Sequence, residues 1–170
     1  MNTLRPLLLA LLLLPLCAAA QLTVVRWAYG PFGTPGDAAY VVDGNRIHQS
    51  CGPLGSRGPV VYVLDPELGI VYHAADGFGR RGTPAFTAEG DRLIRCSGPN
   101  CTPGACVLLL DGNKVFRGDG PFCNKGEGAF LLDGNVVHLA YGPFASQGDA
   151  LFQVDGDLPL LALLAILAGY

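Results

Sequence analysis

Charged residues are scarce in this sequence, and the scarcity excludes whole classes of partner. Asp, Glu, Lys and Arg make up 15% of the 170 residues, and 11 basic and 14 acidic side chains give a formal net charge of -3. Domains that bind nucleic acid carry a basic patch or stripe, and this sequence has no such footprint. It also has no acidic tail. We therefore expect no nucleic-acid partner.

Residue patterns that carry catalysis or metal binding are also lacking. No Ser or Cys stands at a motif-like spacing that would indicate a nucleophile. His48 and His138 occupy equivalent places in the repeats described below, with His73 near the corresponding place, and we interpret them as duplicated surface histidines. The Cys-x4-Cys-x4-Cys spacing fits no common zinc pattern, and no calcium-loop spacing occurs. We expect no metal site and no cofactor.

The first twenty residues have the composition of a leader. Arg5 precedes an apolar run from Leu7 to Leu16, and three alanines then lead to Gln21. This order is typical of a secretory signal peptide that is cleaved after a small residue. We assign residues 1–20 to a signal peptide and expect a secreted or surface-associated protein, extracellular or periplasmic.

The mature chain contains six repeats of one sequence unit. The glycines that open the units lie 22 residues apart, with one step of 24: Gly36, Gly58, Gly82, Gly104, Gly126 and Gly148. Two, four and six residues after each glycine the side chains are mostly apolar, as in Cys106, Leu108 and Leu110, and the middle one is always aromatic or Leu. Alternation with a period of two indicates a strand with one buried face. We predict that these positions form the core.

Tight turns follow these strands. Each turn except the second opens with an acidic residue followed by a glycine, as in Asp111-Gly112-Asn113 and Asp133-Gly134-Asn135. Such residues tolerate the positive φ that hairpin turns require. A shorter apolar run then leads to a Gly-Pro connection in most units. The sequence thus predicts an all-β domain over residues 21–157, with about twelve short antiparallel strands in six 22-residue hairpin repeats.

The two ends of the repeat array complement each other. Residues 24–32 match residues 136–144 almost letter for letter, so the chain begins on the second strand of a unit and its last unit ends on a first strand. Pairing these two strands removes the exposed edges of an open sheet. We expect residues 23–29 to pair with 150–154 and close a β-trefoil-like, propeller-like or barrel-like form. An open, curled meander of hairpins is the alternative.

Five cysteines remain in the mature chain: Cys51, Cys96, Cys101, Cys106 and Cys123. Export favours disulfide bonds, and an odd number leaves one thiol free or bonded between chains. Cys96 and Cys106 flank one connection and are the best-placed pair. Cys101 and Cys123 hold equivalent places one repeat apart, about 10 Å from each other, which is too far to bridge unless the loops bend together. A buried, unbonded Cys106 is a further alternative.

An apolar residue stands at the centre of five of the six connections: Phe32, Leu54, Phe78, Phe122 and Phe144. The sixth has Asn100 there. If the five side chains face outward, they form an apolar rim suited to a protein or glycan partner. If they face inward, they pin the loops. We expect pinning, because burial explains a repeated aromatic residue most simply, and we keep the five as candidate binding residues.

The last thirteen residues, 158–170, carry no charge and are too short to span a bilayer. A closed ring does not need this tail, yet exposed it would make a secreted protein insoluble. Leu and Ala favour a helix, which we expect to pack on the domain; membrane contact through residues 158–170 is the alternative. Six equal units favour a non-enzymatic module that binds protein or glycan, or is structural. An exported hydrolytic enzyme with an unrecognised site is the rival hypothesis.

Overall fold

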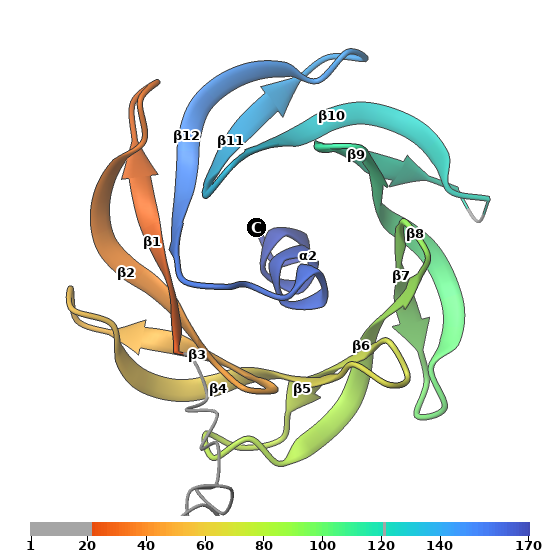
Figure 1. Cartoon of the computed structure of the whole chain (residues 1–170). Helices are drawn as coiled ribbons and strands as arrows, with labels where there is room; N and C mark the ends of the chain where they lie inside the picture. The colour runs from red at the N-terminus through yellow and green to blue at the C-terminus, as the bar shows by residue number, and fades with distance from the viewer. Residues whose placement is uncertain (1–21, 121) are drawn as a thin grey trace, which may run out of the picture.

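Twelve antiparallel strands follow one another around a closed ring (Figure 1), in a computed structural model that describes residues 22–120 and 122–170. The assigned signal peptide, residues 1–20, lies outside the described residues. The strands are β1 (Thr23–Tyr29), β2 (Thr34–Asp43), β3 (Arg46–Cys51), β4 (Ser56–Asp65), β5 (Ile70–Ala74), β6 (Arg81–Glu89), β7 (Arg92–Ser97), β8 (Thr102–Asp111), β9 (Lys114–Asp119), β10 (Asn124–Asp133), β11 (Val136–Tyr141) and β12 (Ser146–Asp155). One helix follows, α2 (Leu160–Ala168).

The ring closes where the sequence predicts. Strand β1 pairs with β12, with Val25 opposite Val154 and Trp27 opposite Phe152. Across this seam the guanidinium of Arg26 donates to the Asp155 carboxylate at 2.7 Å. The prediction of an all-β ring of six hairpins, closed by its first and last strands, is confirmed, and its form is a barrel in which every strand pairs with its neighbours in the chain.

The Asp-Gly-Asn turns gather at one end of the barrel, which we call the narrow end (Figure 1). Their glycines adopt the left-handed backbone, with φ of 62° at Gly112 and 60° at Gly134. The Asn113 carbonyl accepts the backbone N–H of Leu132, and the Asn135 carbonyl accepts that of Val154, each at 2.8 Å. Each of these turns is therefore tied to the hairpin that follows it.

The opposite end, which we call the wide end, carries the six connections from an odd strand to the next even strand, and these splay outward in Figure 1. All six strand pairs joined at this end contain register shifts. The shifts turn the residue three places after the opening glycine inward, so that Ala39 and Ala129 belong to the core. The predicted face looks into the central core four and six places after the glycine. Two places after it, most residues are buried as predicted but lie outside the central cluster, as Ala38 does under a neighbouring loop beside Gly55.

Helix α2 fills the barrel (Figure 1). Its side chains Leu164, Ile166 and Leu167 are at most 3% exposed and pack against inward residues of the strands. A ring of this many strands encloses more space than its own side chains can fill. The expected packing of the tail on the domain is confirmed, and the tail lies inside the ring. Within the described ranges, no helix has the length and apolar character needed to cross a membrane.

Candidate functional site

The six connections at the wide end share one backbone geometry. In each, the N–H of the fourth residue donates to the carbonyl of the first, over 3.2–3.4 Å. Proline at the second position suits such a turn because its φ is already fixed. The third connection lacks proline, and there the Asp76 carboxylate accepts the backbone N–H groups of Phe78 and Arg80, each at 3.1 Å. These bonds, chiefly that of Arg80, lower the pKa of the Asp76 carboxyl.

The fourth residue of every connection has a positive φ. The six angles are 69° at Gly33, 83° at Gly55, 85° at Gly79, 51° at Cys101, 56° at Cys123 and 50° at Ala145. Three of these residues carry a Cβ, which the left-handed backbone disfavours. Ala145 is accommodated because it lies over Gly128, where a Cβ would stand 2.6 Å from its own. The loop conformation is thus imposed by the packing around it.

Each connection folds back over the first strand of the preceding hairpin. A backbone N–H of that strand, left unpaired by the bulge, donates to a carbonyl of the loop. Val60 donates in this way to Gly77 at 3.1 Å, and Ala150 donates to Gly30 at 3.0 Å. Ala38 and Gly128 make the equivalent bonds to Pro53 and Gly142. These bonds hold the loops in fixed positions and point their third residues away from the barrel.

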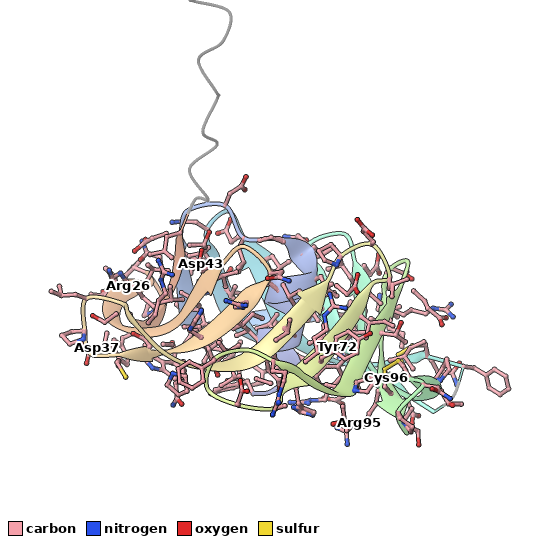
Figure 2. All side chains as sticks on the ribbon, turned by 90° about the horizontal axis from the view of Figure 1, so that it is seen from below. Arg26, Asp37, Asp43, Tyr72, Arg95 and Cys96 are labelled. Carbon is pink, nitrogen blue, oxygen red and sulfur yellow. A yellow bond between two sulfur atoms is a disulfide. The ribbon has the colours of Figure 1, made fainter. Side chains whose placement is uncertain are left out.

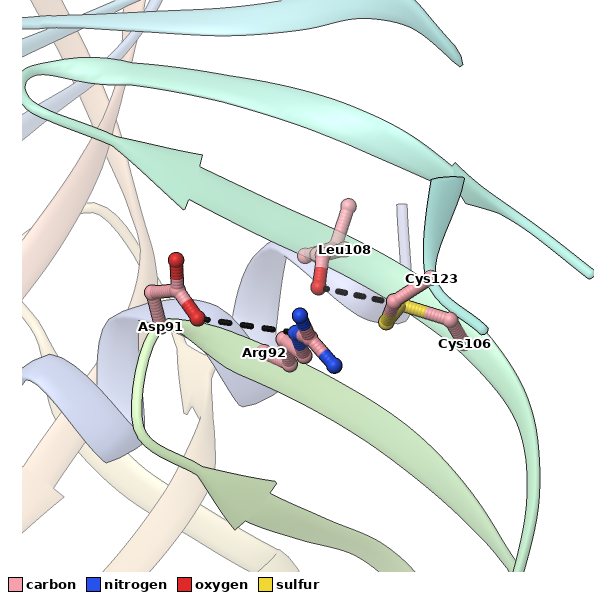
Figure 3. The surroundings of a disulfide bond; sticks show 5 residues. All are labelled: Asp91, Arg92, Cys106, Leu108 and Cys123. Atoms are coloured by element: carbon pink, nitrogen blue, oxygen red, sulfur yellow. Dashed lines mark hydrogen bonds and ion pairs between the residues drawn. A yellow bond between two sulfur atoms is a disulfide. The ribbon is translucent and has the colours of Figure 1, made fainter. Parts of the chain in front are cut away.

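Disulfides reinforce two neighbouring connections. Cys96 bonds to Cys101, with the Cα atoms 4.4 Å apart, and closes its own loop. Cys106 bonds to Cys123, with the Cα atoms 5.1 Å apart, and fastens a loop to the strand beneath it (Figure 3). This second bond lies in a small buried cluster with Ile94.

The expected pair of Cys96 with Cys106 is wrong. The register of β7 and β8 places Cys96 opposite Pro103 and Cys106 opposite Ile94, so the two thiols do not face each other. Cys106 is buried but bonded, which also corrects the alternative of an unbonded residue. Cys101 and Cys123 are not joined to each other, and Cys51 is exposed and unpaired among the described cysteines.

The five candidate binding residues project into solvent. Phe32, Leu54, Phe78, Phe122 and Phe144, which we call the apolar tips, are 93%, 86%, 88%, 80% and 79% exposed. The expectation that they pin the loops is therefore wrong. The loop is held by backbone hydrogen bonds and by the residue after each tip, so the tip itself has nothing to pack against. The tips surround the wide end as separate apolar contacts on rigid turns.

Two of the three histidines are not surface residues. His48 and His138 are only 9% and 4% exposed. The Nδ1 atom of His48 lies 2.9 Å from the Gly58 carbonyl, and that of His138 lies 3.3 Å from the Gly148 carbonyl. Strands β12, β1 and β2 separate the two residues around the ring. The structure therefore does not bring them together, and it corrects the surface interpretation for both.

Four of the six acids that open the turns, Asp43, Asp65, Asp111 and Asp155, form ion pairs with basic residues of the strands. Asp65 pairs with Arg81 at 2.9 Å and Asp111 with Lys125 at 2.6 Å, and the Lys125 ammonium lowers the pKa of the Asp111 carboxyl. Asp43 pairs with Arg57 in the same way. In residues 22–120 and 122–170, no group of three His, Cys, Asp or Glu side chains could hold a metal ion. These carboxylates serve the turns and the ion pairs.

A second set of equivalent positions lines the lumen at the wide end and was missed in the sequence. Each lies two places after a buried residue of an odd strand and faces the central residue of the adjoining even strand: Trp27, Gln49, His73, Arg95, Arg117 and Leu139. Counting two residues on from a buried strand residue such as Ile47 or Leu93 could have identified these positions in the sequence. Arg95 lies at the lower edge of Figure 2.

Two cavities open beside these residues. They measure about 600 and 490 Å³ and share Tyr62 and His73 in their walls. The rings of Tyr62 and His73 lie 5.5 Å apart. Burial, and secondly the charge of Tyr40, raises the pKa of Tyr62, so its hydroxyl remains protonated and can donate a hydrogen bond at neutral pH.

In comparisons with known proteins, no family model, no curated protein and no solved structure matches this chain. The arrangement of its own residues therefore carries the functional argument.

Proposed function

We propose that this chain is a secreted or surface-associated, non-enzymatic module that binds a partner protein through the apolar tips. The observation that carries the proposal is the exposure of 79–93% at five equivalent positions. Isolated apolar residues are common on protein surfaces, but here an exposed apolar residue recurs at the same position in five separate rigid turns. The two disulfides indicate an oxidising compartment, and a signal peptide over residues 1–20 would deliver the chain there.

The turns support binding because they hold the tips in place before a partner arrives. Each tip lies between residues whose backbone is fixed by a hydrogen bond across the turn and by the loop's contacts with the barrel. A contact on a rigid loop loses little conformational entropy on binding. Aromatic anchors that enter pockets of a partner are typical of the residues that dominate binding energy at protein interfaces.

A protein suits these tips better than a glycan. Recognition of a polar ligand relies on a few placed hydrogen-bonding groups beside apolar surface. The immediate neighbours of Phe32 are Pro31 and Gly33, and those of Leu54 are Pro53 and Gly55, which bring no polar side chain. An apolar pocket on a partner protein can receive such a tip without any polar side chain beside it.

The rival hypothesis of a hydrolytic enzyme has less support. It would need a cluster of polar side chains around one position, whereas His48 and His138 are buried on different parts of the ring. Their equivalent bonds to Gly58 and Gly148 suggest a structural role in holding the bulged strands.

The experiment is a binding screen of the oxidised mature chain against arrays of extracellular proteins and of glycans. The test variant replaces all five apolar tips by Ser, which removes apolar contacts without disturbing buried packing. The control is Leu68→Ser, which changes an apolar side chain that is 63% exposed in the turn between β4 and β5 at the narrow end. We expect a protein ligand that the wild type and the control retain and the five-tip variant loses.

Other outcomes would change the conclusion. Retention of the ligand by the five-tip variant would place binding elsewhere on the molecule. Glycan ligands lost in the same variant would replace the protein partner by a carbohydrate. Turnover of ester, peptide or glycoside substrates that is lost in His138→Ala would favour the enzyme hypothesis.

A further inference from the structure

Basic side chains gather on one arc of the lumen at the wide end. Three successive odd strands, β5, β7 and β9, place His73, Arg95 and Arg117 at equivalent inward positions. The other three equivalent positions, on β1, β3 and β11, hold Trp27, Gln49 and Leu139. The repeat itself does not require a basic residue there. The arc therefore breaks the symmetry of the barrel at one place.

Arg95 and Arg117 have no carboxylate partner among the described residues. Six of the ten described Lys and Arg side chains do have one: Arg26, Arg57, Arg80, Arg81, Arg92 and Lys125. Guanidinium groups are planar donors that match oxyanions well. Arg95 is thus free to bind an anion from outside the chain.

The cavity beside Arg95 is lined by both apolar and polar residues. Phe86, Pro84 and Ala168 are apolar residues of its lining, with Ala168 supplied by the end of α2. Arg95, His73 and Thr83 are polar residues of the same lining, and Tyr62 and His73 also line the second cavity. A volume of about 600 Å³ is in the range of small-molecule sites. The Cys96–Cys101 disulfide fixes the loop that forms the outer wall with Gly98 and Pro99.

We propose that this cavity binds an amphipathic organic anion, whose carboxylate, sulfonate or phosphate group lies at Arg95 and whose apolar body lies on Phe86 and Ala168. The guanidinium of Arg95 donates to the oxyanion, and His73 and the Tyr62 hydroxyl are further polar groups of the lining. The apolar body covers the end of the buried helix, which leaves the wide end otherwise open to water. This site is separate from the apolar tips and does not depend on them.

The probe is 8-anilinonaphthalene-1-sulfonate, and N-phenyl-1-naphthylamine, the same body without the sulfonate, is its neutral match. Titration of the oxidised mature chain is followed by probe fluorescence and by calorimetry for stoichiometry. We expect one sulfonate probe per chain. Arg95→Gln should weaken its affinity about tenfold or more, because a hydrogen bond to a charged group is lost. Arg95→Lys, which keeps the charge, should weaken it less.

Two variants control this measurement. Arg92→Gln removes a basic side chain from the same strand, on the other side of the sheet at the narrow end, and should leave the affinity within about twofold of the wild type. Thr83→Trp, which fills the cavity from its lining, should weaken both probes. Affinity for the neutral probe should be the same in Arg95→Gln as in the wild type.

The proposal is overturned if the sulfonate probe does not bind, if Arg95→Gln binds it as well as the wild type does, or if Arg92→Gln has the same effect as Arg95→Gln. It is also overturned if Phe78→Ser abolishes binding, since the probe would then lie at the apolar tips. Melting curves of each variant show whether it is folded, and Thr83→Trp tests the same cavity should Arg95→Gln fail to fold.

Discussion

Helix α2 should stabilise the barrel as its central packing element, and two leucines of the helix allow a matched test. Leu164 is 3% exposed inside the ring, whereas Leu160, four residues earlier, is 47% exposed. Replacement of either by Ala keeps or improves helix propensity, so any loss of stability reports packing. Leu164→Ala removes a buried side chain and leaves a cavity, which costs about 2–5 kcal/mol. Leu160→Ala should cost less than about 1 kcal/mol, as partly exposed positions do.

Urea titration followed by Trp27 fluorescence measures the difference. The Trp27 ring lies 4.9 Å from that of Phe152 and 6.4 Å from that of Tyr170, so its emission reports the lumen. Circular dichroism should give the same midpoint if unfolding is two-state. In thermal melts, Leu164→Ala should lower Tm by about 4–20 °C. Equal losses in the two variants, or a loss below about 1 kcal/mol for Leu164→Ala, would refute the placement of the helix inside the ring.

Three further perturbations test the loops and the closure. The double variant Cys106→Ala and Cys123→Ala should lose about 3 kcal/mol in urea titrations, because the bond closes a loop of 17 residues; unchanged stability would mean that the bond does not form. The Asp76 pKa is lowered from 3.8, so its carboxylate stabilises the fold above that pH and loses this effect as the pH falls through the lower folded-state pKa. Asp76→Ala should therefore melt below the wild type at about pH 7, and the difference in Tm should shrink as the pH is lowered below 3.8; a difference that does not change with pH would contradict this cause. Deletion of residues 21–29 should expose the edges of β2 and β12 and cause aggregation in size-exclusion chromatography, whereas a soluble protein of unchanged Tm would show that closure is not needed.

The closed ring could be predicted because its signals are local and repeated. Residues such as Asp111-Gly112-Asn113 determine a hairpin turn almost alone, and the match of residues 24–32 with 136–144 indicates which strands must meet. The core face was predicted less well. Ala38 and Ala39 are both small and apolar, so their composition does not reveal the bulge that turns one outward and the other inward.

The conformation of the loops is harder to predict from the sequence than the core face, because it depends on contacts between repeats. An aromatic residue at a loop tip has the same sequence pattern whether it is buried or exposed, and only the fold-back of the loop exposes Phe78. The disulfide from Cys106 to Cys123 likewise follows from that fold-back, not from sequence spacing. The place of the helix was within reach, since a twelve-stranded barrel needs a filler and residues 158–170 were the remaining apolar segment.

The central claim is that the apolar tips bind a partner protein, and the affinities of single-tip variants test it most directly. With the protein ligand from the screen, dissociation constants are measured for Phe32→Ser, Phe78→Ser and Phe144→Ser, with Leu68→Ser as the control. Loss of one buried apolar contact of about 1.5–3 kcal/mol predicts that at least one tip variant binds about 10- to 100-fold more weakly, while the control binds as the wild type does. Equal affinities for all three tip variants and the control would contradict the claim.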